Sequence, residues 1–94
     1  MLVERSYLIA REGLEERFAA TMAERGLPLL QALDGVDAVS FGRGVERPDR
    51  FMLLIEWRDM AAHTAFTGLP IFAEFCELVA PFTKGGEMEH FEME

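Results

Sequence analysis

The sequence has no asparagine, one cysteine (Cys76) and one lysine (Lys84). A single cysteine cannot form an internal disulfide, and a chain without asparagine has no N-glycosylation sequon. Nine basic residues stand against 17 acidic ones, which gives a formal net charge of −8 at pH 7. Nucleic acids and anionic membrane surfaces are bound through clustered lysine and arginine. The composition therefore predicts that neither is a partner and that the negative charge serves solubility.

Long apolar runs are also absent, and none approaches the roughly 20 residues that a membrane-spanning helix needs. The first residues lack the basic start and long apolar core of a secretory signal, so we expect a cytoplasmic protein with no membrane partner. Hydrophobic residues make up 50% of the chain and charged residues 28%, a balance typical of a globular protein. The length of 94 residues predicts a single domain over residues 1–94.

The hydrophobic and turn patterns predict the element order β-α-β-β-α-β. Alternating apolar positions predict strands over residues 2–9, 36–45, 51–57 and 87–93. Apolar residues three and four positions apart predict helices over 14–25 and 60–81, the second with a pause at 68–70. We expect Gly26 and Pro28 to interrupt the first helix, with a short helical turn over 28–33 after them. We expect Gly85 and Gly86 to lie in the loop before the last strand.

This order predicts an α+β, ferredoxin-like fold, in which two helices cover one face of an antiparallel sheet. The strand over 51–57 is apolar on both faces apart from Glu56. Such a strand belongs to a sheet that is covered on both sides. Because two helices cover only one face, we expect a homodimer in which two sheets pack face to face.

Three stretches resemble the antibiotic biosynthesis monooxygenase (ABM) family: PDRFMLLIEWRDMAAH over 48–63, LPIFAEF over 69–75 and EHFE over 89–92. Members of that family commonly have a strand that ends in Glu and Trp, an acidic helix start and a histidine in the first or second helical turn. The corresponding residues here are Glu56, Trp57, Asp59 and His63. The resemblance implies a dimeric α+β barrel with a pocket between helices and sheet in each subunit.

The resemblance also implies a range of activities. Some members oxidise quinols or polyketide aromatics with O₂ and without a metal or organic cofactor, whereas others degrade haem or process small signalling molecules. Members of the haem-degrading branch are similar to one another in having an asparagine on the first strand and a histidine late in the second helix. Here the late-helix position holds Cys76 and no asparagine exists, so we do not expect haem degradation. The polar residues nearest to that first-strand position are Arg5, Ser6 and Tyr7.

His63 is the candidate proton acceptor, because a histidine with a pKa of about 6.5 exchanges protons at neutral pH. The flat rings of Trp57, Phe66 and Phe72 are candidates for holding an aromatic or apolar ligand. On the first strand, Tyr7 and Arg5 share a face with Val3 and Ile9 and would polarise or anchor oxygen atoms.

Each assignment has a structural alternative. His63 could be satisfied by a backbone carbonyl or a carboxylate, and the aromatic rings could only pack the core. Arg5 could pair with a carboxylate such as Glu56 or Glu92.

Neither a metal nor an organic cofactor is expected. Zinc-type sites need clustered ligands, whereas His63, His90 and Cys76 are scattered along the chain without CxxC or HxxxH spacing. The leading hypothesis is a cofactor-independent monooxygenase of an electron-rich aromatic, such as a quinol or polyketide-like ring.

Two alternatives stay open. One is an isomerase or cyclase on the same scaffold, and the other is a non-catalytic dimeric module that binds a small ligand or acts as an accessory protein. A deep pocket containing His63 would favour an enzyme. A pocket filled by phenylalanines would favour the module.

Overall fold

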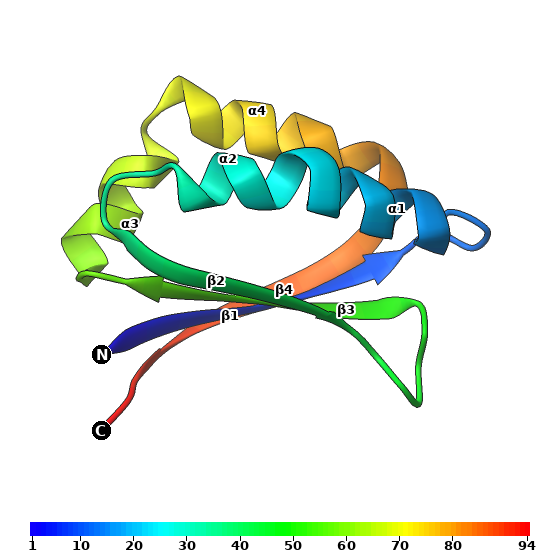
Figure 1. The fold of residues 1–94 in the computed structure, drawn as a ribbon, viewed down its shortest axis with the longest axis horizontal. Coiled ribbons are helices and arrows are strands. Elements are labelled where there is room, and N and C mark those ends of the chain that lie inside the picture. The colour runs from blue at the N-terminus through cyan, green and yellow to red at the C-terminus, as the bar shows by residue number, and fades with distance from the viewer.

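The computed structural model describes residues 1–94 as a helical layer on one face of a sheet (Figure 1). In chain order the elements are β1 (Leu2–Ala10), α1 (Glu15–Thr21), the π-helical turn η1 (Met22–Gly26), α2 (Leu27–Gln31), β2 (Val36–Arg43), β3 (Arg50–Trp57), α3 (Met60–Thr67), α4 (Pro70–Val79), the 3₁₀ turn η2 (Ala80–Phe82) and β4 (Thr83–Glu92). The helices lie on the same side of the sheet, and its opposite face carries no element of this chain (Figure 1).

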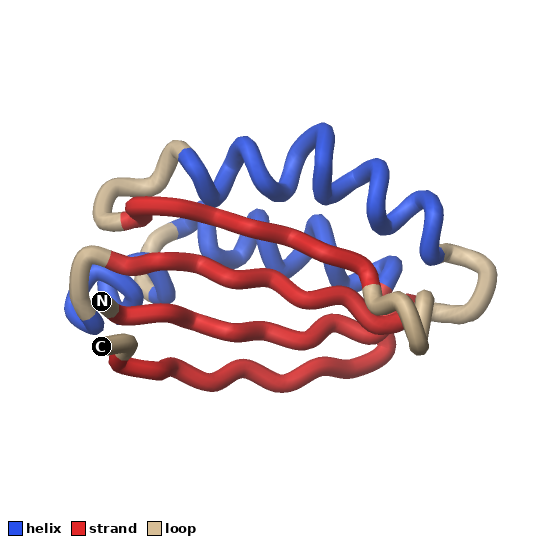
Figure 2. The backbone as a smooth tube through the Cα atoms, turned by 60° about the horizontal axis from the view of Figure 1, so that its bottom comes forward, coloured by secondary structure: helices blue, strands red, loops and turns tan.

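The sheet has the strand order β2-β3-β1-β4, and every neighbouring pair is antiparallel (Figure 2). This arrangement confirms the ferredoxin-like α+β prediction. β1 is central and pairs along its length with β3 and β4. The two chain ends meet beside each other, where the backbone N–H of Met93 donates to the carbonyl of Met1 at 2.8 Å.

Burial alternates along β3 and shows which face the helices cover. Buried side chains from β3 point toward the helices; they are Phe51, Leu53, Ile55 and Trp57. Phe18, Met22 and Leu30 from the first helical segment complete this core, and each is at most 1% exposed. The intervening residues, such as Met52 and Leu54, belong to the opposite face and keep contact with solvent. Only one of the two apolar faces of β3 is therefore buried within a single chain.

The first helical segment differs from its prediction at Gly26 and Pro28, because residues 15–31 are helical without a break. Proline lacks an N–H and its ring conflicts with the carbonyl of the fourth preceding residue. The π-helical turn η1 lies directly ahead of Pro28 and changes the hydrogen-bond spacing there. Gly26 keeps helical angles, with φ −65° and ψ −51°. The chain therefore passes the proline without ending the helix.

The second helical segment follows its prediction. Asp59 caps α3 by accepting a hydrogen bond from the N–H of Ala62 at 2.8 Å, and Pro70 begins α4 after the expected pause. No single helix is long and apolar enough to cross a membrane. α3 and the stretch Pro70–Phe82 meet the length and composition criteria only as a pair, and that pair is bent by 77°.

β2 and β4 have different bounds from those predicted. β2 ends at Arg43 because the chain turns at Gly44, whose N–H donates to the carbonyl of Arg50 at 2.6 Å. β4 begins at Thr83, so Gly85 and Gly86 lie inside the strand, opposite Ile9 and Leu8, and not in a loop. A Cβ at Gly86 would lie 2.2 Å from the carbonyl oxygen of Tyr7. Glycine therefore permits a close approach of β4 to β1 that any side chain would prevent.

Replacing Gly86 by alanine should lower the free energy of unfolding by about 1–3 kcal/mol, because the β1–β4 backbones must move apart. Chemical denaturation of both proteins measures this difference. The neighbouring substitution Gly85→Ala is the control, since a Cβ there meets nothing within 4 Å. Equal losses for the two variants would contradict the steric explanation.

Candidate functional site

A buried carboxylate, that of Glu4, lies at the centre of the candidate site. Glu4 is on the face of β1 that the helices cover, and it is 6% exposed. Its Oε1 accepts a hydrogen bond from the indole N–H of Trp57 at 3.0 Å, and its Oε2 accepts one from the hydroxyl of Ser6 at 3.0 Å. A buried charge is tolerated when such donors surround it.

Both histidines of the chain lie against this carboxylate. The N-cap at Asp59 sets the start of α3, and His63 follows one turn later and faces the sheet. His90 is directly opposite Glu4 in the β1–β4 register. The Nε2 atoms of His63 and His90 lie 3.4 and 3.7 Å from Oε1 of Glu4, and the two rings are 4.3 Å apart between centroids. We refer to Glu4, His63 and His90 as the Glu4 cluster.

The surroundings of His63 shift its protonation. Burial lowers the pKa of His63 from the ordinary value of 6.5, because the charged ring loses hydration. The charge of Glu4 opposes this effect, and the neighbouring His90 adds to the lowering of the pKa. The ring is therefore neutral near pH 7 and can take up a proton. The carboxylate beside it stabilises the imidazolium that results.

An apolar cavity of about 200 Å³ separates the sheet from α3 and α4, with Glu4, Ser6 and His63 among its lining residues. Ten of its 14 lining residues are hydrophobic, including Phe66 and Phe72, whose rings stack with centroids 5.2 Å apart. Pockets for drug-sized ligands usually measure roughly 300–1,000 Å³. The cavity therefore suits a small ring-bearing molecule with its polar atoms toward His63 and Glu4.

The predicted site residues divide between the two faces of the sheet. His63, Phe66 and Phe72 line the cavity together. Trp57 is 1% exposed and lies beside His63, with ring centroids 5.3 Å apart, but it is not among the lining residues. The Trp57 ring packs edge-to-face against the His63 ring, and its N–H donates a hydrogen bond to Glu4.

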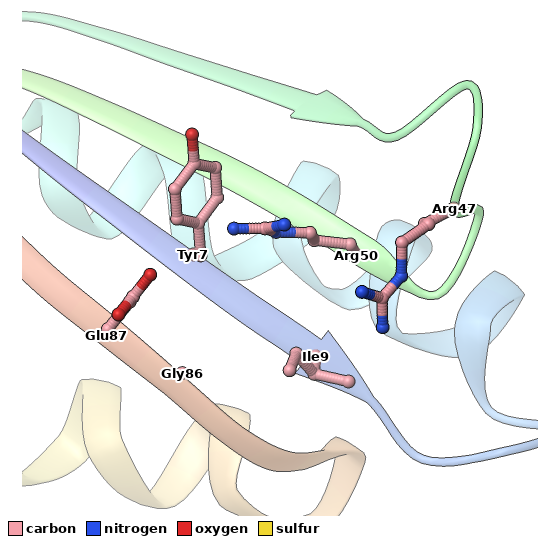
Figure 3. Close-up of a pocket in the computed structure, with 6 residues that line it drawn as sticks. All are labelled: Tyr7, Ile9, Arg47, Arg50, Gly86 and Glu87. Carbon is pink, nitrogen blue, oxygen red and sulfur yellow. The ribbon is translucent and has the colours of Figure 1, made fainter.

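Arg5 and Tyr7 are not brought to this cavity, because odd positions of β1 face away from the helices. The Tyr7 ring lies between two guanidinium groups, with Cζ of Arg5 4.4 Å and Cζ of Arg50 4.0 Å from the ring centroid. Figure 3 shows the Tyr7 and Arg50 side chains next to each other on the open face. Arg5 forms its ion pair with Glu89, its direct β4 neighbour, and not with Glu56 or Glu92.

The two histidines are scattered along the sequence, but the inference that they do not cluster was wrong. Residues 63 and 90 are far apart in sequence, but the β1–β4 register and the first turn of α3 bring them to one carboxylate. Sequence reasoning therefore missed Glu4, Ser6 and His90 as site residues. One signal was present for the first two: Glu4 and Ser6 share a strand face with Leu2 and Leu8.

Comparisons with known proteins agree with the fold. The family model for antibiotic biosynthesis monooxygenases matches residues 1–78. YczJ of Bacillus subtilis, an uncharacterized protein, is 29% identical in an alignment 94 positions long that covers 98% of each chain.

Among solved structures, a Bordetella bronchiseptica protein bearing the same family name has a TM-score of 0.88 and 25% identity, with 99% of this chain and 96% of that one covered. SnoaB of Streptomyces nogalater, described as a cofactor-independent oxygenase, has a TM-score of 0.85 and 14% identity, covering 98% of this chain and 91% of that one. An identity of 14% relates SnoaB to this chain by fold alone.

Replacing Trp57 by phenylalanine should lower the free energy of unfolding by about 1.5–3 kcal/mol, because Glu4 loses a hydrogen bond to a charged group while staying buried. Chemical denaturation of Trp57→Phe, Glu4→Gln and the double variant measures the coupling between the two residues. Fully additive losses would show that the Trp57–Glu4 contact contributes nothing specific.

Proposed function

The chain belongs to the antibiotic biosynthesis monooxygenase family, and from this premise we propose that it oxidises a small electron-rich aromatic molecule with O₂. The substrate would occupy the cavity between the sheet and α3 and α4. His63 would accept its proton. The single observation that carries this proposal is the position of His63, which lines an apolar cavity while its Nε2 lies 3.4 Å from a buried carboxylate.

The environment of His63 supports the role of proton acceptor. A lowered pKa keeps the ring neutral, and therefore able to accept a proton, near pH 7. The carboxylate of Glu4 then stabilises the protonated ring. Phe66 and Phe72 provide a stacked aromatic wall for the substrate. Arg5 and Tyr7, which lie across the sheet, have no role in this cavity.

The reaction balances without an external reductant. Loss of a proton to His63 turns a phenol or an anthrone-like ring system into an anion that can donate electrons to O₂. When a ring CH₂ becomes a carbonyl, the substrate gives up four electrons and both hydrogens. One oxygen atom enters the product and the other leaves as water. The proton held by His63 returns in forming that water.

Two observations bear on the alternatives. SnoaB, a cofactor-independent oxygenase by its description, has the same fold, which supports oxygenation. The cavity is lined but not filled by phenylalanines, which favours an enzyme over a non-catalytic binding module. An isomerase or cyclase would use the same proton transfer without O₂, so oxygen consumption separates it from the oxygenase.

We also propose that the active form is a homodimer joined through the open face of the sheet. This face exposes apolar side chains that no element of the chain covers, among them Met52 at 36%, Phe91 at 41% and Met93 at 50% exposure. A shallow depression on it is lined by Val3, Leu54 and Phe91. A second copy packed on this face would bury the apolar residues of β3 that the helices leave uncovered.

Light scattering at micromolar concentration should give twice the monomer mass of 10.6 kDa. Leu54→Glu should give the monomer mass, because it places an unpaired charge in the proposed interface. Met60→Glu is the matched control, since Met60 is 48% exposed on α3 and lies outside that face. A wild-type monomer, or a dimer that survives Leu54→Glu, would contradict this interface.

With chelator present, the protein should consume O₂ above the rate of autoxidation with at least one member of a panel of quinols and anthrones. His63→Ala should lower the rate by about 10²–10⁴-fold, the usual contribution of a general base. Thr64→Ala is the control, because Thr64 is the exposed neighbour of His63 on the same helix. An oxygen electrode or optode measures all three proteins.

Undiminished turnover by folded His63→Ala would remove His63 from the mechanism. No uptake with any member of the panel, although panel compounds bind the cavity, would exclude oxygenation of these rings. That result would favour an isomerase or cyclase.

A further inference from the structure

We propose that the Glu4 cluster is also a binding site for a divalent transition-metal ion, a property separate from the proposed oxygenation. Two imidazoles and one carboxylate offer ligand atoms that all lie within 4.8 Å of one another. This set of two histidines and one carboxylate suits zinc and the neighbouring first-row metals. It comes from three different elements, β1, α3 and β4, so only the folded chain assembles it.

The spacing between Oε1 of Glu4 and each histidine nitrogen is close to that of tetrahedral coordination. Zinc lies about 2.0–2.2 Å from histidine nitrogen and carboxylate oxygen, which places neighbouring ligand atoms about 3.3 Å apart. The distances from Oε1 of Glu4 are 3.4 Å to Nε2 of His63 and 3.7 Å to Nε2 of His90. Small side-chain rotations would therefore close the three ligands around one ion.

The nitrogen of His90 supports the same conclusion. Its Nε2 atom is buried and has no hydrogen-bond partner, although it faces Oε1 of Glu4. A buried polar atom without a partner is uncommon in folded proteins and needs an explanation. A metal ion between His90, His63 and Glu4 would supply the missing interaction.

The residues around the Glu4 cluster indicate how tightly it would bind a metal ion. The indole N–H of Trp57 and the hydroxyl of Ser6 hold the Glu4 carboxylate in place, as outer hydrogen bonds do in metal sites. Nδ1 of His63, by contrast, has no hydrogen-bond partner to fix the ring. We therefore expect reversible binding that is weaker than at a structural zinc site.

Three protein ligands leave one tetrahedral position open, and Glu4 and His63 both line the apolar cavity. The open position would hold water or an anionic oxygen of a ligand in that cavity. Metal and proton would then compete for His63, so that Zn²⁺ inhibits turnover. This consequence alone rests on the proposed function, whereas metal binding itself does not.

The test is titration of chelator-treated protein with ZnCl₂ by calorimetry and with CoCl₂ by visible absorption, without substrate. All proteins carry Cys76→Ser, so that the one thiol of the chain cannot supply a ligand. We expect one ion per chain, with d–d bands typical of four-coordinate Co²⁺.

His90→Gln and Glu4→Gln should each weaken metal binding by at least about tenfold, a loss that removal of even a hydrogen-bond partner of a ligand produces. Glu46→Gln, at an exposed position, controls for general attraction to a chain of net charge −8.

Binding that is unchanged in His90→Gln, or lost equally in Glu46→Gln, would overturn the site. The site would also be overturned if the parent protein, which carries only Cys76→Ser, bound neither Zn²⁺ nor Co²⁺. Circular dichroism verifies that each variant folds, and His90→Gln decides the matter if Glu4→Gln does not fold, because the His90 side chain is less buried. The titrations contain no substrate, so a failure to bind metal would not count against the proposed function. Oxygen uptake tests that function separately.

Discussion

The buried charge of Glu4 is the constraint on which the candidate site depends. A carboxylate on the covered face of a central strand needs donors from several directions, because an unpaired buried charge costs several kcal/mol. Ser6 on β1 and Trp57 on β3 donate hydrogen bonds to it, and His63 on α3 and His90 on β4 bring their Nε2 atoms to 3.4 and 3.7 Å from Oε1. Each of these side chains is thereby oriented toward one point at the end of an apolar cavity. The same arrangement that stabilises the carboxylate would prepare His63 for the proposed proton transfer.

The two-residue period of a strand separates the proposed catalytic site from the proposed dimer interface. Along β1, Glu4 and Ser6 face the helices, and Arg5 and Tyr7 face the other way. The covered face holds the cavity. The open face holds a mixture of apolar side chains and ion pairs, such as that between Arg5 and Glu89. A mixed surface of this kind suits contact with another copy of the chain better than it suits a buried catalytic site.

Two chemistries are possible at one cluster because imidazole nitrogen binds either a proton or a metal ion. Burial lowers the pKa of His63 and the charge of Glu4 opposes this, so that in the proposed reaction the neutral ring would accept a proton from a substrate. The second histidine changes the character of the site. With His63 alone, the carboxylate–histidine pair would be an ordinary proton acceptor, whereas His90 completes a set of three ligands. The balance between the two states would depend on free metal concentration and on occupation of the cavity.

Local periodicity and hydrogen-bonding side chains were enough to predict the element order, the ferredoxin-like α+β fold and the cap at Asp59. The pattern also indicated His63, Phe66 and Phe72, which line one cavity from two consecutive helices, α3 and α4. No local pattern indicates that His90 meets Glu4 or that Arg5 and Tyr7 lie across the sheet from His63; the folded chain shows both. Both results follow from the strand register and from which face of the sheet the helices cover. Long-range packing sets the register and the covered face. The continuous helix through Pro28 and the β4 pairing at Gly86 have the same origin, since contacts with the rest of the fold outweigh the local preference of proline and glycine.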